Sequence, residues 1–188
     1  MTELSRVPLR EAADTLIECF KGGGKLLLCG NGGSAADCAH IAGELMKGFK
    51  KKRPLPDDLK AAIGTDKLQM GLPALDLTAQ GALIAAVNND QGGEYVYAQQ
   101  VMACGRPGDV LIGISTSGNA QNVVWAVKAA KALGLNTIAL TGAGGGALSA
   151  LCGLTLRSDE TETYLVQEDH LRFYHRLCLM VEEAFFDV

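Results

Sequence analysis

The sequence lacks the features that would mark a nucleic-acid-binding, membrane or secreted protein. Its 17 lysine and arginine residues are outnumbered by 21 aspartate and glutamate residues, and the net charge of −4 predicts no general attraction to nucleic acid or acidic membranes. No apolar run approaches membrane-spanning length, and the first residues carry charges where a secretory signal would be apolar. We expect a cytoplasmic protein that has neither nucleic acid nor membrane as a partner.

Paired cysteines are missing too, and histidine is scarce. The six cysteines contain no C-x-x-C pair and several lie inside apolar runs, so we expect buried free thiols and no disulfide or thiolate metal site. The only histidines are His40, His170 and His175.

The one basic cluster, residues 47–53, is interpreted as a solvated helix end or loop; the alternative is a local rim that attracts phosphate.

An alternation of apolar strands and helices is what the sequence does contain. Strands are predicted at residues 25–29, 73–77, 109–115, 136–142 and 151–157. Helices are predicted over 9–21, from about residue 34, around 94–101, over 122–134 and over about 162–186. Strands without polar alternation, each separated by a helix, indicate a parallel sheet covered on both faces.

The 188 residues are therefore predicted to form one domain, residues 1–188, with an N-terminal helix. The predicted fold is a three-layer α/β/α sandwich around a doubly wound, five-stranded parallel sheet. The polar segment 55–71, whose periodicity is weak, is predicted to be a surface excursion and an insertion.

Two loops at predicted strand ends have the composition of an anion site. GNGGS (residues 30–34) follows the first strand, and STSGN (residues 115–119) follows the third. Ligands of open parallel sheets bind beyond the carboxyl ends of the strands. Glycines let backbone N–H groups approach an anion, hydroxyls donate to it, and the following helix directs its positive end there. Phosphate is the ligand that we expect at these two loops.

Neither loop matches a Walker or a dinucleotide-binding motif. GNGGS alone is equally well interpreted as a tight turn with a helix cap. Three adjacent hydroxyls in the second loop exceed what capping requires and favour anion binding. A third glycine loop, residues 141–146, has no comparable polar cluster and is interpreted as a turn.

His40 and Glu44 are four residues apart on the helix that follows GNGGS, so they share one face. They lie about 9–15 Å along the helix from the loop, which a phosphorylated carbon chain could span. Three interpretations stay open: an ordinary surface contact, two ligands of one metal, or a base and its partner.

The final predicted helix offers Gln167, Glu168, His170 and His175. Gln167 and His175 are eight residues apart, about 12 Å along a helix, and could bind one metal only by leaning toward each other. On spacing alone, His170 is the easier co-ligand of Gln167.

Four segments together carry a resemblance to a known family. They are CGNGGSAADCAHIAGEL (29–45), NND (88–90), GDVLIGISTSGNAQNVVWAVKAAKALG (108–134) and VQEDHLRFYH (166–175). In this order they resemble the SIS-domain phosphosugar isomerases, most closely the sedoheptulose 7-phosphate isomerase (phosphoheptose isomerase) family. The resemblance implies a flavodoxin-like sandwich, a homotetramer with active sites at subunit interfaces, and zinc as cofactor, with one ion per site.

The resemblance also implies roles for individual residues. The substrate-binding set would be Asn31, Gly32, Gly33, Ser34, Glu44, Asn89, Asp90, Ser115, Thr116, Ser117 and Gln167. The zinc ligands would be His40, Glu44, Gln167 and His175, which makes His170 the second choice. Glu44 and His175 would be the catalytic acid–base pair. The implied reaction interconverts sedoheptulose 7-phosphate and a glycero-manno-heptose 7-phosphate through an enediolate.

The chain departs from the family pattern at three places, all of which concern the identity of the sugar. Ala120 stands where the family usually has a serine, an arginine common in the family is replaced around Leu165, and segment 55–71 is additional. Two alternatives stay open: an isomerase for another phosphosugar, and a non-catalytic SIS module that binds a replication initiator or senses a sugar phosphate. The complete set His40, Glu44, Gln167 and His175 favours an enzyme.

Overall fold

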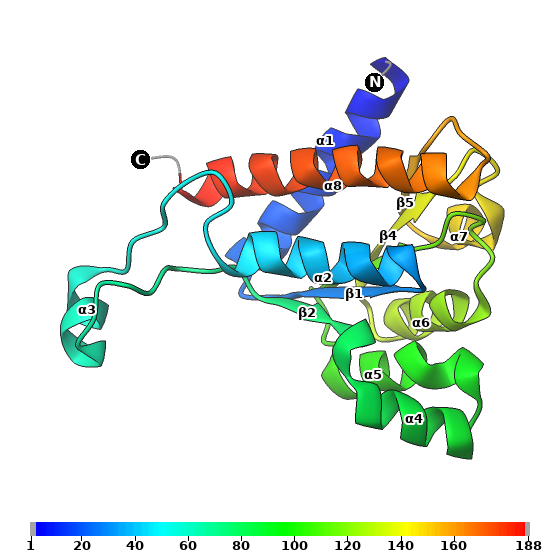
Figure 1. Cartoon of the computed structure of the whole chain (residues 1–188), viewed down its shortest axis with the longest axis horizontal. Coiled ribbons are helices and arrows are strands. Elements are labelled where there is room, and N and C mark those ends of the chain that lie inside the picture. Colours follow the sequence, from blue (N-terminus) through cyan, green and yellow to red (C-terminus); the bar gives the residue numbers. More distant parts are fainter. Residues whose placement is uncertain (1–2, 187–188) are drawn as a thin grey trace.

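The computed structural model describes residues 3–186, with side chains from residue 8 onward (Figure 1). The helices are α1 (Glu3–Lys21), α2 (Gly33–Met46), α3 (Asp57–Ile63), α4 (Gly81–Asp90), α5 (Val96–Cys104), α6 (Gln121–Ala132), α7 (Gly146–Leu151) and α8 (Thr163–Phe186). The strands are β1 (Leu26–Gly30), β2 (Ala74–Asp76), β3 (Val110–Ile114), β4 (Asn136–Thr141) and β5 (Leu154–Arg157). Two short 3-10 helices, η1 (Leu77–Ala79) and η2 (Gly93–Tyr95), complete the described elements.

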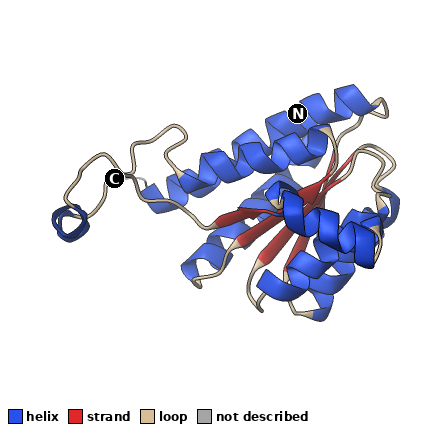
Figure 2. Ribbon diagram, turned by 60° about the horizontal axis from the view of Figure 1, so that its bottom comes forward, coloured by secondary structure: helices blue, strands red, loops and turns tan. Residues whose placement is uncertain are grey.

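All five described strands are parallel and lie in the order β2-β1-β3-β4-β5. Helices cover both faces of this sheet, as Figure 2 shows. The three-layer sandwich and the five-stranded parallel sheet predicted from the sequence are confirmed. None of the described helices combines the length and apolarity needed to cross a membrane.

Each face of the sheet has its own hydrophobic core because alternate side chains of a strand point to opposite sides. Leu26 and Leu28 of β1 pack with α1, α2 and α8, whereas Leu27 and Cys29 pack with α5, α6 and α7. All five residues of β1 are buried. Burial on both faces explains why the strands are continuous apolar runs without alternation.

The structure corrects several predicted boundaries. Helix α1 begins at Glu3 rather than residue 9. Strand β5 begins at Leu154 rather than residue 151, because Leu151 is the last residue of α7. Helices α4 and α7 are not predicted from the sequence. Both are short, and α4 buries only Val87, so neither has an apolar stripe long enough to give a helical period.

The interpretation of residues 47–53 as solvated is wrong for Arg53. Lys47, Lys50 and Lys52 are exposed, but the Arg53 side chain is fully buried and forms an ion pair with Glu182 of α8. A run of basic residues ordinarily indicates a solvated segment. The partner that makes burial possible here comes from a distant part of the sequence.

Segment 55–71 forms an arm that projects from the sandwich (Figure 1). Pro54 and Gln69 form an antiparallel bridge at the base of the arm, and none of the residues of α3 is buried. Leu59, Ile63 and Leu68 on this arm are exposed. The predicted surface excursion thus contains a helix that makes no part of either core.

Candidate active site

The strand order reverses between β1 and β3. The chain passes from β1 through α2 to β2 on one side, and later returns to β3 on the other side of β1. Helix α2 belongs to one core and α6 to the other, so the loops after β1 and β3 diverge from adjacent strand ends. Such a switch point is where open α/β sheets bind ligands. The GNGGS and STSGN loops both lie there.

Asn31 connects the two loops. Its side-chain amide exchanges hydrogen bonds of 2.9 Å in both directions with Asn122, at the start of α6. The hydroxyl of Tyr97, on α5, donates to the Gly30 carbonyl at 2.6 Å and lies 3.2 Å from Asn31 Oδ1. Sequence reasoning missed both partners. Asn122 is three residues beyond STSGN, so its position alone could have made it a candidate site residue. No local sequence pattern distinguishes Tyr97 in this way.

The STSGN loop is tightly folded. Ser115 and Ser117 Oγ atoms are 3.5 Å apart, and the Gly118 N–H donates to the Ser115 carbonyl at 2.9 Å. Gly118 has φ +69°, and a side chain there would collide with the backbone of Gly145. The third glycine loop, residues 141–146, is therefore the packing partner that closes STSGN, and it contains the predicted turn before α7.

His40, Glu44 and His175 meet between α2 and α8. One ligand atom from each lies within 4.8 Å of the other two. His40 Nε2 is 3.1 Å from Glu44 Oε1 and 3.4 Å from His175 Nε2. Two imidazole nitrogens and a carboxylate oxygen facing one another form a donor set that fits a divalent cation such as zinc. Burial and the neighbouring His40 lower the pKa of His175, which favours the neutral imidazole.

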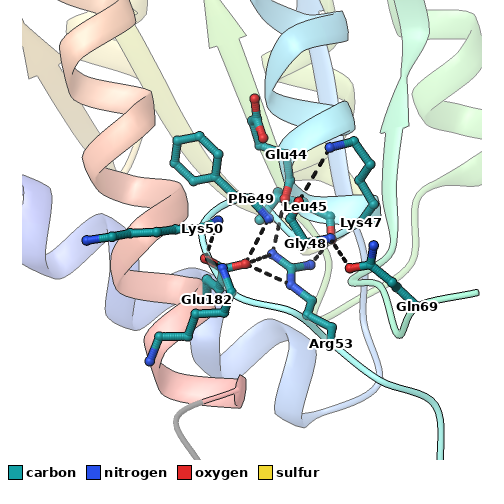
Figure 3. A network of polar contacts seen from close by, with 10 residues as sticks. Glu44, Leu45, Lys47, Gly48, Phe49, Lys50, Arg53, Gln69 and Glu182 are labelled. Carbon is teal, nitrogen blue, oxygen red and sulfur yellow. Dashed lines mark hydrogen bonds and ion pairs between the residues drawn. The ribbon is translucent and has the colours of Figure 1, made fainter.

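The far end of α2, which carries Glu44, is held by the buried Arg53–Glu182 pair (Figure 3). The Arg53 guanidinium donates to the carbonyl oxygens of Leu45 at 2.6 Å and Glu44 at 3.1 Å. The Glu182 carboxylate accepts the backbone N–H groups of Phe49 and Lys50 at 2.9 Å each. Burial opposes ionisation of Glu182, but these N–H groups and Arg53 hold its pKa below the usual value.

The Arg53–Glu182 network also positions Phe49 against the cluster of His40, Glu44 and His175. The Phe49 backbone is fixed by Glu182, and the Phe49 ring lies against the His175 ring with centroids 5.5 Å apart. Behind the cluster, the hydroxyl of Tyr174 lies 2.9 Å from His40 Nδ1. Burial, and then the nearby Asp37 carboxylate, raise the pKa of Tyr174, so the phenol keeps its hydrogen.

The other predicted residues of α8 lie elsewhere. Gln167 is on α8, and its side chain lies beside the first residue of α2, Gly33. A Cβ on Gly33 would come within 2.6 Å of the amide nitrogen of Gln167. This position is beside the GNGGS loop, about 12 Å along α8 from His175. His170 is fully buried and is not part of the His40 cluster, and Glu168 is exposed.

Asn89 and Asp90 end α4, where the Asn89 amide donates to the Asp90 carboxylate at 2.8 Å. Both are exposed. Within the described part of the chain, no hydrogen bond joins either residue to the two loops or to the His40 cluster. Their predicted role in substrate binding stays a prediction.

The chain is similar to known proteins over nearly its whole length. Residues 1–142 match the SIS domain family. A phosphoheptose isomerase of Trichlorobacter lovleyi is 42% identical over 181 residues, which cover 96% of this chain and 84% of that protein. A phosphoheptose isomerase of Campylobacter jejuni is 41% identical over 184 residues, covering 98% of this chain and 90% of that protein.

Solved structures agree with this assignment. Phosphoheptose isomerase GmhA from Neisseria gonorrhoeae is 37% identical, with a TM-score of 0.80 over 94% of this chain and 85% of that one. These matches confirm the resemblance inferred from the four sequence segments. The chain belongs to the phosphoheptose isomerase family of SIS-domain proteins.

Proposed function

We propose that this chain interconverts sedoheptulose 7-phosphate and a glycero-manno-heptose 7-phosphate by proton transfer through an enediolate. The observation that carries the proposal is the meeting of His40, Glu44 and His175 on α2, which begins at the GNGGS loop, and α8, whose Gln167 lies beside that loop. An isomerase of this kind needs an anchor for the phosphate and acid–base groups at the reacting carbons. Membership of the phosphoheptose isomerase family supports the same reaction.

The phosphate is bound by the GNGGS and STSGN loops. Its anchoring groups are the hydroxyls and backbone N–H groups of Asn31, Gly32, Gly33, Ser34, Ser115, Thr116 and Ser117. Glycine at position 33 gives the substrate and Gln167 room to approach the start of α2, since a Cβ there would meet the Gln167 amide. Asn89 and Asp90 bind the sugar hydroxyls. Binding energy gained at the phosphate is remote from the reacting carbons and helps to orient them.

Glu44 and His175 move the protons. Glu44 removes a proton from C1 of the ketose, the C–H electron pair forms the C1–C2 double bond, and the π pair of the C2 carbonyl moves onto its oxygen to give the enediolate. While it is not bound to metal, His175 takes the hydrogen from the C1 oxygen, whose O–H electron pair becomes the C1 carbonyl bond, and delivers that hydrogen to the C2 oxygen. Glu44 returns its proton to C2. Burial and the neighbouring His40 lower the pKa of His175, which favours the neutral imidazole, the form that can accept a hydrogen. Glu44 Oε1 faces His40, which leaves the other oxygen for the proton.

Zinc is the proposed metal, held by His40, Glu44 and His175, whose ligand atoms face one another. The family resemblance implies Gln167 as a fourth ligand, although its amide lies beside Gly33 in this structure. When bound, it would polarise the substrate carbonyl and stabilise the negative charge of the enediolate. The mutual distances of the two Nε2 atoms and Glu44 Oε1 support a metal at this position. Metal analysis of the purified protein, with activity measured after chelation and after zinc is restored, tests this. A metal-free protein with full activity would exclude zinc.

Glu44→Gln tests the catalytic assignment. The variant keeps the size of the side chain but loses the base, so we expect turnover of sedoheptulose 7-phosphate to be abolished in a folded protein. Glu183→Gln makes the same change at an exposed position of α8 and is the matched control. Near-normal turnover by Glu44→Gln would count decisively against the proposal. A screen of five-, six- and seven-carbon ketose phosphates identifies the sugar.

We also propose that the protein is a single SIS domain over residues 1–188, with 55–71 as an insertion, and works as a cytoplasmic homotetramer. Large apolar side chains that are exposed in the single chain support assembly; they include Met46, Ile63, Leu68 and Met102. Light scattering coupled to size-exclusion chromatography measures the mass of the assembly directly. A monomer at micromolar concentration would contradict this part.

A further inference from the structure

Tyr174 occupies a position behind the metal-ligand cluster that the reaction itself does not use. Its side chain is 1% exposed, and its ring meets the rings of His40 and His175 edge-on, with centroids 5.3 Å and 5.1 Å away. Its hydroxyl lies 2.9 Å from His40 Nδ1 and 3.3 Å from Asp37 Oδ1. Asp37 is on α2, one turn before His40. Tyr174 therefore bridges an acid and an imidazole of the facing helix.

The two ring nitrogens of His40 have different surroundings. Nε2 faces Glu44 and His175, whereas Nδ1 faces only the Tyr174 hydroxyl among the described residues. A histidine that binds a metal through Nε2 must carry its hydrogen on Nδ1, and that hydrogen needs an acceptor. A phenol can accept through its oxygen while donating its own hydrogen elsewhere. Asp37 Oδ1 lies where it accepts the hydrogen bond donated by the Tyr174 O–H.

We propose that Tyr174 is a positioning residue: its oxygen accepts the Nδ1–H of His40 and its O–H donates a hydrogen bond to Asp37, so that the Nε2 lone pair of His40 is directed at the metal. Outer partners of this kind fix the tautomer and the ring orientation of metal-bound histidines. The inference rests on the proposed zinc site. It adds Tyr174 and Asp37 as residues that determine zinc affinity without touching metal or substrate.

The test is zinc affinity, measured on metal-free protein by competition with a chromogenic chelator. Tyr174→Phe keeps the ring but leaves the Nδ1–H of His40 without its acceptor, so we expect zinc binding to weaken by about 10- to 100-fold. Tyr164→Phe, which removes a hydroxyl from an exposed tyrosine of the same helix, is the matched control and retains wild-type affinity. Thermal melts of the metal-free proteins establish that both variants fold.

Asp37 supplies a second, independent variant. Asp37→Ala removes the acceptor of the phenol hydrogen and weakens zinc binding, whereas Asp37→Asn keeps an oxygen at that position and restores most of the affinity. Wild-type zinc affinity in both Tyr174→Phe and Asp37→Ala overturns the inference and leaves the zinc site intact. Absence of stoichiometric zinc binding by the wild-type protein overturns the zinc site itself, and the role of Tyr174 with it.

Discussion

Replacing Arg53 by methionine is expected to destabilise the fold severely. The side chain is fully buried, its Nη2 is 2.9 Å from Glu182 Oε1, and it donates to the carbonyls of Glu44 and Leu45. Breaking a buried ion pair by removing one partner costs about 3–5 kcal/mol because a buried charge is left uncompensated. The backbone N–H groups of Phe49 and Lys50 still neutralise part of the Glu182 charge, which places the expected loss near 3 kcal/mol.

The measurement is urea unfolding with linear extrapolation, at one fixed protomer concentration because the protein is expected to be an oligomer. A loss near 3 kcal/mol is a large part of the 5–15 kcal/mol that typically stabilises a domain. Lys52→Met removes an exposed cation from the adjacent position and is the control, with an expected change within about 0.5 kcal/mol. Equal unfolding free energies for the two variants would refute the argument that the Arg53–Glu182 pair anchors α2.

Three further outcomes are expected. The pKa of Glu182 is lower in the folded protein than its usual value of 4.5, so stability should fall as pH drops below that value, and Glu182→Gln should flatten this fall in acid-unfolding curves. Gly33→Ala should displace the Gln167 amide and raise KM, visible as a normal melting temperature with impaired kinetics. Ala120 is the N-cap of α6 and has no side-chain hydrogen bond, so Ala120→Ser should stabilise by about 1 kcal/mol in urea titrations and also lower KM for the phosphosugar.

The parts of the fold that the sequence predicts are those set by local pattern. A strand buried on both faces must be a continuous apolar run, and β1 and β3 are such runs. Helix α4 was not predicted because only Val87 is buried and only Ile84 is half-buried, while its other residues are exposed. Arg53 escaped for the opposite reason: its neighbours are solvated lysines, and its burial depends on Glu182, which only the packing of α8 against α2 brings close.

The same distinction divides the candidate site. His40 and Glu44 share a face because they are one turn apart on α2, a relation that the sequence contains in full. That His175 joins them depends on the register of α8 against α2, which no local pattern specifies, and only the family resemblance indicated it. Neither helical spacing nor the family resemblance indicates a role for Tyr174, because a tyrosine on the apolar face of a helix is usually an ordinary core residue. Its hydroxyl acquires a role only because Asp37 and His40 present an acid and a ring nitrogen to it across the helix interface. The pair His40 and Glu44 can therefore be predicted from helical spacing. The hydrogen bond that Tyr174 makes to His40 cannot, because it depends on the packing of two distant segments.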